Sequence, residues 1–353
     1  MTFYQELQLS QAGSKSYIAS FEQPRDRWIH IGIYLFKIIL NIAFCTAFIA
    51  SFCLLFGAAN SIAGLSVLLC VMVFRCADLG IRPTHGAACI FLLYAILAVG
   101  PKLSCMLPAG WAFGTNALFL LLLLVLGCHN VLMFNHSTLV LAYLLLLGND
   151  VSGAQYEKRL LGLLAGAVLT AAVYYRNHRK KSYKRTFQSL FREFRLPSAR
   201  TQWQLRFALT ISSAMLIASL LGIPKAMWIG IAAMSVCMPF PDDMAKRVKF
   251  RAPGNILGCI LFLAAYFLLP EGSVSYLGIL GGIGTGLSAT YGWQTTFNAF
   301  SALSMAVPAL GLPGAVLLRI FGNVFGSVYA WTFAHVFRPI ITSLCRIYSL
   351  ASS

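Results

Sequence analysis

Long apolar stretches separated by short polar segments follow one another along most of the chain. A helix that spans a bilayer needs about 20 apolar residues, and about twelve stretches reach or approach that length. We predict spanning helices at residues 31–57, 60–77, 83–100, 109–128, 135–149, 159–175, 204–222, 226–240, 252–269, 274–290, 293–310 and 315–336. The shorter ones require a thinned bilayer or a place inside the bundle. The pattern predicts an all-helical integral membrane protein.

Composition supports the same class. Hydrophobic residues make up 59% of the chain and charged residues 10%, with a mean hydropathy of +0.76, which a water-soluble domain does not reach. The formal net charge of +17 is typical of basic loops held against an anionic leaflet rather than of a nucleic-acid-binding protein. Most of the 10 cysteines lie in apolar runs without the spacing of a zinc site. We therefore expect no metal, cofactor or nucleic acid.

Basic residues also predict the orientation, because cytoplasmic loops retain Lys and Arg. With the N-terminus inside, most of the 27 basic residues fall on cytoplasmic segments. Both termini are then cytoplasmic, and the protein is a multi-pass protein of the inner, cytoplasmic membrane. We find no removable signal peptide in the polar first thirty or so residues.

One basic segment divides the chain. Its residues Phe187, Leu190, Phe191 and Phe194 recur at the spacing of one helix face, so we expect it to lie flat on the inner membrane surface; a solvated connector is the alternative. The predicted organisation is a cytoplasmic N-terminal segment (1–30), a first six-helix repeat (31–175), a basic amphipathic linker (176–203), a second six-helix repeat (204–337) and a cytoplasmic tail (338–353).

The two halves match at a fixed offset. Lys37 and Arg206 are separated by the same number of residues as Arg82 and Arg251. Because each half has an even number of predicted helices, the two repeats should be parallel, related by an axis along the membrane normal.

A sharper motif, RxxGxxxG, occurs three times and places its three marked residues in one narrow helical stripe. The copies comprise Arg159, Gly162 and Gly166; Arg251, Gly254 and Gly258; and Arg319, Gly322 and Gly326, while Arg82, His85 and Cys89 form a degraded fourth copy. All four open a predicted helix. Within each half the copies should face opposite sides of the membrane, which suggests two inverted three-helix units per repeat. The glycines favour close helix packing, and ordinary packing with a snorkelling arginine is the alternative explanation.

Residues in the second half resemble a known family. Leu205 and Arg206 at a helix start, Trp228 early in the next helix, Met238–Pro239 and the run from Arg251 to Gly258 are similar to the fusaric acid resistance-like family of aromatic acid exporters, which is distantly related to aluminium-activated malate transporters. The resemblance implies a membrane protein that exports organic anions. His85, where the family pattern leads us to expect glycine, is a departure in the first half.

A carboxylate that crosses a low-dielectric bundle needs a cation to offset its desolvation, and arginine binds it bidentately. We predict that the substrate-binding residues are Lys37, Arg82, Arg159, Arg206, Arg251 and Arg319, together with the stripe residues Asn255 and Asn323. The expected partners are a small organic anion and the lipid bilayer, and the sequence leaves a homo-oligomer open.

Proton coupling would require a titratable group. The main candidates are Asp242, Asp243 and His85, and the loop residues Asp78, Asp150 and Glu157 are further candidates. Pairing of these groups with neighbouring basic residues is the alternative. An organic-anion channel with the same cationic pathway is the nearest rival to an exporter. A membrane enzyme that acts on a lipid-linked substrate is the rival from another class, although the chain has no HExxH motif and no Ser/His/Asp arrangement.

Overall fold

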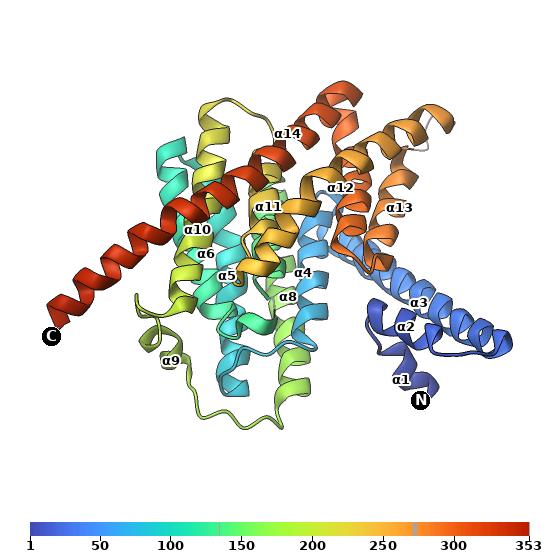
Figure 1. Cartoon of the computed structure of the whole chain (residues 1–353), viewed down its shortest axis with the longest axis horizontal. Coiled ribbons are helices and arrows are strands. Elements are labelled where there is room, and N and C mark those ends of the chain that lie inside the picture. The colour runs from blue at the N-terminus through green and yellow to red at the C-terminus, as the bar shows by residue number, and fades with distance from the viewer. Residues whose placement is uncertain (134, 271–273, 353) are drawn as a thin grey trace. The chain divides into compact units, whose positions relative to one another are not determined.

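The computed structural model describes residues 1–133, 135–270 and 274–352, and over these residues it is all-helical, without strands (Figure 1). Its helices are α1 (Phe3–Leu7), α2 (Gln11–Ala19), α3 (Pro24–Phe56), η1 (Ala58–Asn60), α4 (Ser61–Phe74), α5 (Pro83–Met106), α6 (Ala109–Gly127), η2 (Val131–Met133), α7 (Asn135–Gly148), α8 (Ala154–His178), α9 (Phe187–Arg192), α10 (Ala199–Leu220), α11 (Met227–Val236), α12 (Pro241–Leu268), α13 (Val274–Leu287) and α14 (Tyr291–Ser352).

Seven of the described helices are long and apolar enough to cross a membrane: α3, α5, α6, α8, α10, α12 and α14. Four shorter apolar helices accompany them, over residues 58–74, 135–148, 227–236 and 276–287. The predicted all-helical membrane class is therefore confirmed. The count of about twelve spans and the paired repeats stay predictions. Within α14, Gly311 has a φ of 69°, a left-handed conformation that glycine adopts readily, and this break separates the two spans predicted on either side of it.

The chain forms two compact units. Unit 1 comprises Met1–Ala47 and Lys249–Phe321, and unit 2 comprises Phe48–Val248 and Gly322–Ser353. The boundaries between the units fall inside α3, α12 and α14. The two units reflect packing, whereas the predicted organisation follows repeats in the sequence. The predicted organisation therefore stays a prediction.

Helices α4 to α8, α10 and α11 form the bundle of unit 2, and neighbouring helices lie side by side (Figure 1). Its core contains large side chains with no exposed area, among them Leu93, Leu120 and Tyr143. Small residues let helices approach closely: a Cβ at Gly166 would collide with Val67 of α4. The core side chains fill the space between these helices and hold the bundle ends in place.

The basic linker docks on one end of this bundle. The Arg82 N–H donates to the Arg185 carbonyl (2.9 Å), and the Phe187 N–H donates to Nδ1 of His85 (3.1 Å). Leu190 is 2% exposed and belongs to the core of unit 2. Leu190 therefore packs on the protein, whereas Phe191 of the same face is 48% exposed, so the placement of this linker on the inner membrane surface stays a prediction.

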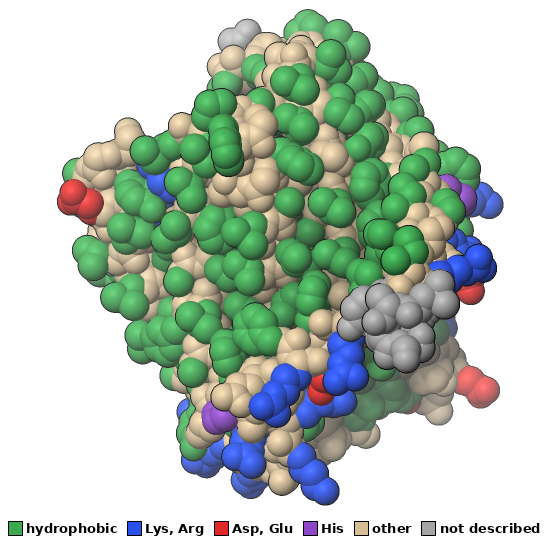
Figure 2. Space-filling view, turned by 90° about the vertical axis from the view of Figure 1, so that its left-hand side faces the viewer, with side chains coloured by type: hydrophobic (Ala, Val, Ile, Leu, Met, Phe, Trp, Pro, Cys, Tyr) green, Lys and Arg blue, Asp and Glu red, His purple; other side chains and the backbone are tan. Residues whose placement is uncertain are grey.

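Outside that contact the linker presents its cations to the surroundings. Figure 2 shows hydrophobic side chains spread over one face, with Lys and Arg side chains gathered at its lower end. The exposed basic residues of the linker region are Arg176, Arg179, Lys180, Lys181, Lys184, Arg185, Arg192 and Arg195. A basic end beside an apolar surface is the distribution expected of a protein whose cations meet an anionic leaflet.

In unit 1 the N-terminal helices pack on α3. Lys37 is 4% exposed, and its ammonium donates to the Leu9 carbonyl (3.0 Å) and to Oγ of Ser14 (2.6 Å). Lys15 donates to the Leu287 carbonyl at the end of α13 (3.1 Å). The predicted substrate-binding cation Lys37 therefore ties the segment 1–30 to the first long helix.

Candidate anion-binding site

A cavity of about 390 Å³ lies in unit 2, at the end of the bundle where the linker docks. We call it the Arg206 cavity. Arg206 and Trp203 reach it from α10, Pro239 from the turn after α11, and His335 and Arg338 from α14. None of the described residues around it is acidic. The cavity therefore combines two guanidinium groups with aromatic walls.

Arg206 has donors left for a ligand. Its Nη2 donates to the Met238 carbonyl (2.9 Å), while its Nε is buried and finds no hydrogen-bond partner among the described residues. An unmet donor on a buried cation is costly. A carboxylate in the cavity would supply the missing acceptor and a counter-charge together.

Two of the aromatic rings around this cavity are held by hydrogen bonds. Nε1 of Trp203 donates to the Cys237 carbonyl (3.1 Å) and the residue is 4% exposed. Nδ1 of His335 donates to the Trp331 carbonyl (2.8 Å). Because a carbonyl can only accept, this contact places a hydrogen on Nδ1 and orients the imidazole. The walls of the cavity are thus set before a ligand arrives.

A second cationic group lies in unit 1. Arg251 and Arg319 are 4% and 2% exposed, and they are close enough for their positive charges to repel each other. Nη1 of Arg251 donates to the Tyr291 hydroxyl (3.2 Å). Asn255, 1% exposed, lies one turn after Arg251 and its Oδ1 accepts from the Cys259 thiol (3.8 Å). Arg251 and Arg319 thus belong to the same compact unit, whereas the topology prediction places them on opposite sides of the membrane.

The predicted position of these arginines at helix starts is wrong. Arg251 lies in the interior of α12, which begins at Pro241, and Arg319 lies two turns beyond the break at Gly311 in α14. Arg82 is the N-cap of α5, and Arg159 lies in the second turn of α8. Helix N-terminal partial charge falls off within the first turn, so it does not add to the cation at Arg251 or Arg319.

Arg159 binds within unit 2 rather than joining another arginine. It is 3% exposed, and its Nε donates to Oδ1 of Asn60 (3.1 Å). The Asn60 amide donates in turn to the Phe56 and Gln155 carbonyls (2.9 and 3.0 Å). In the part of the chain that the structure describes, Arg159 makes no ion pair and its Nη2 has no hydrogen-bond partner. Among the described residues, Arg159 is thus a buried cation held by an amide oxygen rather than by a carboxylate.

The glycines of the three stripes lie against neighbouring helices. In α12, a Cβ at Gly254 would collide with Oγ1 of Thr295, and one at Gly258 with the Thr296 carbonyl. In α8, Gly162 faces Phe52 and Gly166 faces Val67.

In α14, a Cβ at Gly326 would lie 2.6 Å from the Ile229 carbonyl, whereas at Gly322 the nearest atom of Ile229 would be 3.5 Å away. Contact is thus tight at five of the six positions, and Gly322 has room for a methyl group. Asn323, beside it in the stripe, is 1% exposed.

The proposed proton-coupling residues belong to unit 2, whereas Arg251 and Arg319 belong to unit 1. Asp242 and Asp243 are in the first turn of α12, where a carboxylate stabilises a helix N-terminus. His85 accepts the hydrogen bond that docks the linker. Both positions have structural uses, and a role of these residues in coupling stays a prediction.

Asp78 is a buried carboxylate of unit 2, and it is 3% exposed. Burial opposes its ionisation, but hydrogen bonds from Lys181 and Tyr183 (both 2.8 Å) and from the Gly80 N–H, with the Lys181 charge, hold the pKa of Asp78 below its ordinary value. The Lys181 pKa is raised by the same hydrogen bond. Asp78 therefore fastens the linker.

A second group fastens the linker at Glu193. This carboxylate accepts from Arg185 (2.9 Å) and Arg200 (3.2 Å). Burial and the charge of Arg200 lower the pKa of His129 to about 4, so at neutral pH its 3.3 Å contact with Glu193 is not an ion pair. Nε2 of His129 instead accepts from Arg200 (3.2 Å).

The family comparison covers much of the same region. Residues 213–333 match the family model described as fusaric acid resistance protein-like. That segment is fusaric acid resistance protein-like. The predicted resemblance to the fusaric acid resistance-like family is thereby confirmed for this segment, and it indicates a membrane transport or resistance protein; the relationship to aluminium-activated malate transporters stays a prediction. Searches of curated proteins and of solved structures found no match.

The fusaric acid resistance-like segment contains Arg251 and Arg319 and begins just after Arg206. Sequence reasoning missed Trp203, His335 and Arg338 as neighbours of Arg206. Trp203 precedes Arg206 by three residues, so the shared helix face was a visible signal. No sequence signal links α10 with residues 334–341, because that contact arises from packing in unit 2.

Proposed function

We propose that this protein is a membrane transporter that exports organic carboxylate anions, with aromatic acids as the preferred class. The observation that carries the proposal is the Arg206 cavity, where two arginines and three aromatic side chains line one space without an acidic residue among those described. Its volume of about 390 Å³ lies within the usual range of small-ligand pockets, about 300–1,000 Å³.

The chemistry of the cavity suits an aromatic acid. The carboxylate would accept from the free Nε of Arg206, and Arg338 would contribute a second positive charge. The ring of the acid would pack against Trp203 and Phe337, which offer apolar surface in place of water. An aliphatic acid would gain only the first of these contributions.

We infer that the buried arginines Arg159, Arg251 and Arg319 form the remainder of a cationic pathway across the membrane. Each is at most 4% exposed, and a buried cation stabilises an anion far more than an exposed one does. The proposal includes the twelve-span arrangement in two repeats, cytoplasmic termini and residence in the inner membrane. The linker end, with its exposed cations, would then face the cytoplasm.

An organic-anion channel would use the same cations and is the nearest alternative. Saturable flux that is coupled to a gradient would favour the carrier. A membrane enzyme is the alternative from another class, and the family match favours transport over it.

The test is an efflux assay in cells with and without the protein, using benzoate, its uncharged analogue benzamide, and an aliphatic acid of similar size. We expect efflux of benzoate above all, and a loss of about tenfold or more in Arg206→Gln, because a hydrogen-bonded charge contact contributes about 1.5–3 kcal/mol. Arg192→Gln is the matched control, since Arg192 is an exposed linker arginine. Equal efflux by wild type and Arg206→Gln would overturn the assignment of this cavity.

A further inference from the structure

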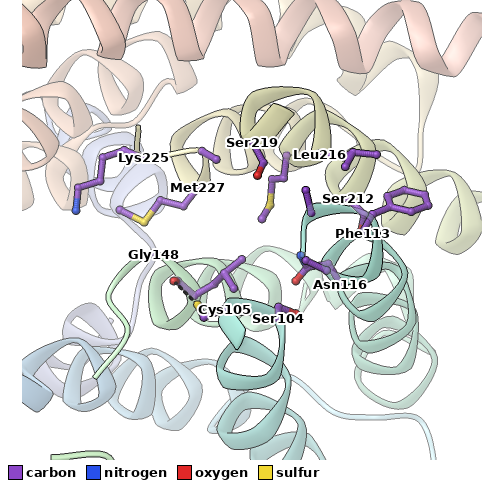
Figure 3. Close-up of a pocket in the computed structure, with 15 residues that line it drawn as sticks. Ser104, Cys105, Phe113, Asn116, Gly148, Ser212, Leu216, Ser219, Lys225 and Met227 are labelled. Atoms are coloured by element: carbon purple, nitrogen blue, oxygen red, sulfur yellow. Dashed lines mark hydrogen bonds between the residues drawn. The ribbon is translucent and has the colours of Figure 1, made fainter. Parts of the chain in front are cut away.

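A second cavity, of about 270 Å³, lies at the opposite end of the unit 2 bundle. We call it the Asn116 cavity. It is lined by the end of α5, the first turns of α6, the end of α7, the C-terminal half of α10 and the start of α11 (Figure 3). Helix α10 reaches both cavities, and Arg206 and Ser219 are about 20 Å apart along it at 1.5 Å per residue.

Polar groups of this cavity lie deep in the bundle. Asn116 is 5% exposed, and its Oδ1 accepts from the Tyr143 hydroxyl (2.8 Å), which commits the oxygen and leaves the amide hydrogens as donors. Ser104, also 5% exposed, shares Tyr143 (3.3 Å). In Figure 3, Asn116 and Ser104 lie near each other on one side of the cavity.

One buried hydroxyl is left without a contact. Ser212 has no exposed area, and its Oγ has no hydrogen-bond partner among the described residues. A buried hydroxyl without a partner costs about 1–3 kcal/mol. Ser212 faces the same cavity as Asn116 (Figure 3), so a ligand oxygen there would offset that cost.

The remaining polar feature is a cation, Lys225. It is partly exposed and the only charged residue among those described around this cavity. Its φ of 57° is uncommon for a residue with a side chain, and such conformations persist where the surrounding structure holds them, often at functional sites. The cavity therefore presents neutral donors and one ammonium group, without an acidic residue among those that the structure describes around it.

We propose that the Asn116 cavity is a second binding site for the exported organic acid, one that binds it more weakly than the Arg206 cavity does. This inference rests on the proposed function. Lys225 attracts the carboxylate, while the Asn116 amide and the Ser212 hydroxyl donate to its oxygens; Ser104 donates to Tyr143 and so holds Asn116 in place. One flexible ammonium group binds a carboxylate less firmly than a guanidinium fork does, so affinity falls from the linker end to the opposite end.

A native thiol reports occupancy without any transport measurement. Cys105 is exposed and lines the Asn116 cavity, whereas Cys76 is exposed at the linker end of unit 2 and lines neither cavity. The purified full-length protein is treated with a neutral maleimide, and the modification rate of each cysteine is followed by peptide mass spectrometry. Benzoate is the probe, and benzamide controls for the charge.

We expect benzoate to slow modification of Cys105 by a factor of 1 + [L]/Kd, about tenfold at ten times the Kd, with Cys76 unchanged and benzamide without effect. Lys225→Gln and Ser212→Ala should lose the protection. Lys158→Gln should keep it, since Lys158 is an exposed lysine that does not line the cavity. Ser212→Ala removes an unpartnered hydroxyl, so it should fold as wild type does.

Two results separate this inference from the proposed function. If benzoate leaves Cys105 unprotected while Arg206-dependent efflux is normal, the second site is overturned and the exporter stands. If protection of Cys105 is equal in wild type and Lys225→Gln, the assignment of the carboxylate to Lys225 is overturned. Protection without any efflux would support the site and contradict the exporter.

Discussion

Arg251 and Arg319 lie close enough within unit 1 for their positive charges to repel each other, and both side chains are at most 4% exposed. Burial of two like charges in one unit opposes folding, and an anion bound beside them would offset their repulsion. In the proposed transporter, this pair would lower the free energy of unfolding and would also bind the transported anion.

Neutralising one member of this pair should separate stability from activity. We expect Arg319→Gln to leave the thermal unfolding temperature close to that of the wild type, because the variant relieves the repulsion from Arg251 but also loses the contacts of the guanidinium. Benzoate efflux should fall at least tenfold. Unfolding in detergent and the efflux assay measure the two quantities. A variant that is clearly less stable yet transports normally would show that Arg319 is structural.

For Arg159 we predict that removing the charge lowers stability. Its Nε bond to Asn60 supports a group that also binds the Phe56 and Gln155 carbonyls. Arg159→Gln would leave Oδ1 of Asn60 unpaired, at a cost of about 1–3 kcal/mol. We therefore expect this variant to unfold at a lower temperature than Arg319→Gln under the same conditions. An unfolding temperature of Arg159→Gln equal to or above that of Arg319→Gln would show that the hydrogen bond between Arg159 and Asn60 does not stabilise the fold.

Two glycines of the stripes provide a matched comparison. A methyl group at Gly258 would collide with the Thr296 carbonyl, whereas at Gly322 the nearest atom would be 3.5 Å away. Gly258→Ala should lower stability by about 1–3 kcal/mol, the usual effect of overpacking, and Gly322→Ala should be close to neutral. Equilibrium unfolding of both variants tests this difference, and equal stabilities would contradict the packing described here.

Asp78 predicts a local effect at the linker. Because its pKa is held below the ordinary value, its stabilising contribution is complete above the unfolded-state pKa and is lost as the pH falls through the lower folded-state pKa. At neutral pH, Asp78→Asn should therefore loosen residues 179–186 and accelerate tryptic cleavage there. Asp26→Asn, in the first turn of α3, is the control. An unchanged cleavage rate in Asp78→Asn would contradict the docking of the linker.

The sequence predicts the membrane class because hydropathy reports burial in lipid directly, and it predicts the family through the residues around Arg206 and Arg251. It misplaces Arg251 and Arg319, because a helix that begins in polar sequence, as α12 does at Pro241, has no apolar start to mark its first residue. It also assigns Leu190 to lipid, since an amphipathic face looks the same whether it meets lipid or protein.

The two cavities of unit 2 could not be predicted from the sequence, for a related reason. Residues such as Arg206 and Arg338 belong to helices that are distant in the chain and meet only through tertiary packing. Lys37 was a candidate because it is a cation in an apolar span. In the structure its ammonium donates to the Leu9 carbonyl and to Oγ of Ser14.

The most direct measurement of the central claim is the affinity of the purified protein for benzoate, by calorimetry, in wild type, Arg206→Gln and Arg192→Gln. The account predicts saturable binding in wild type and Arg192→Gln, and affinity at least tenfold weaker in Arg206→Gln. Equal benzoate affinity in all three proteins would contradict it.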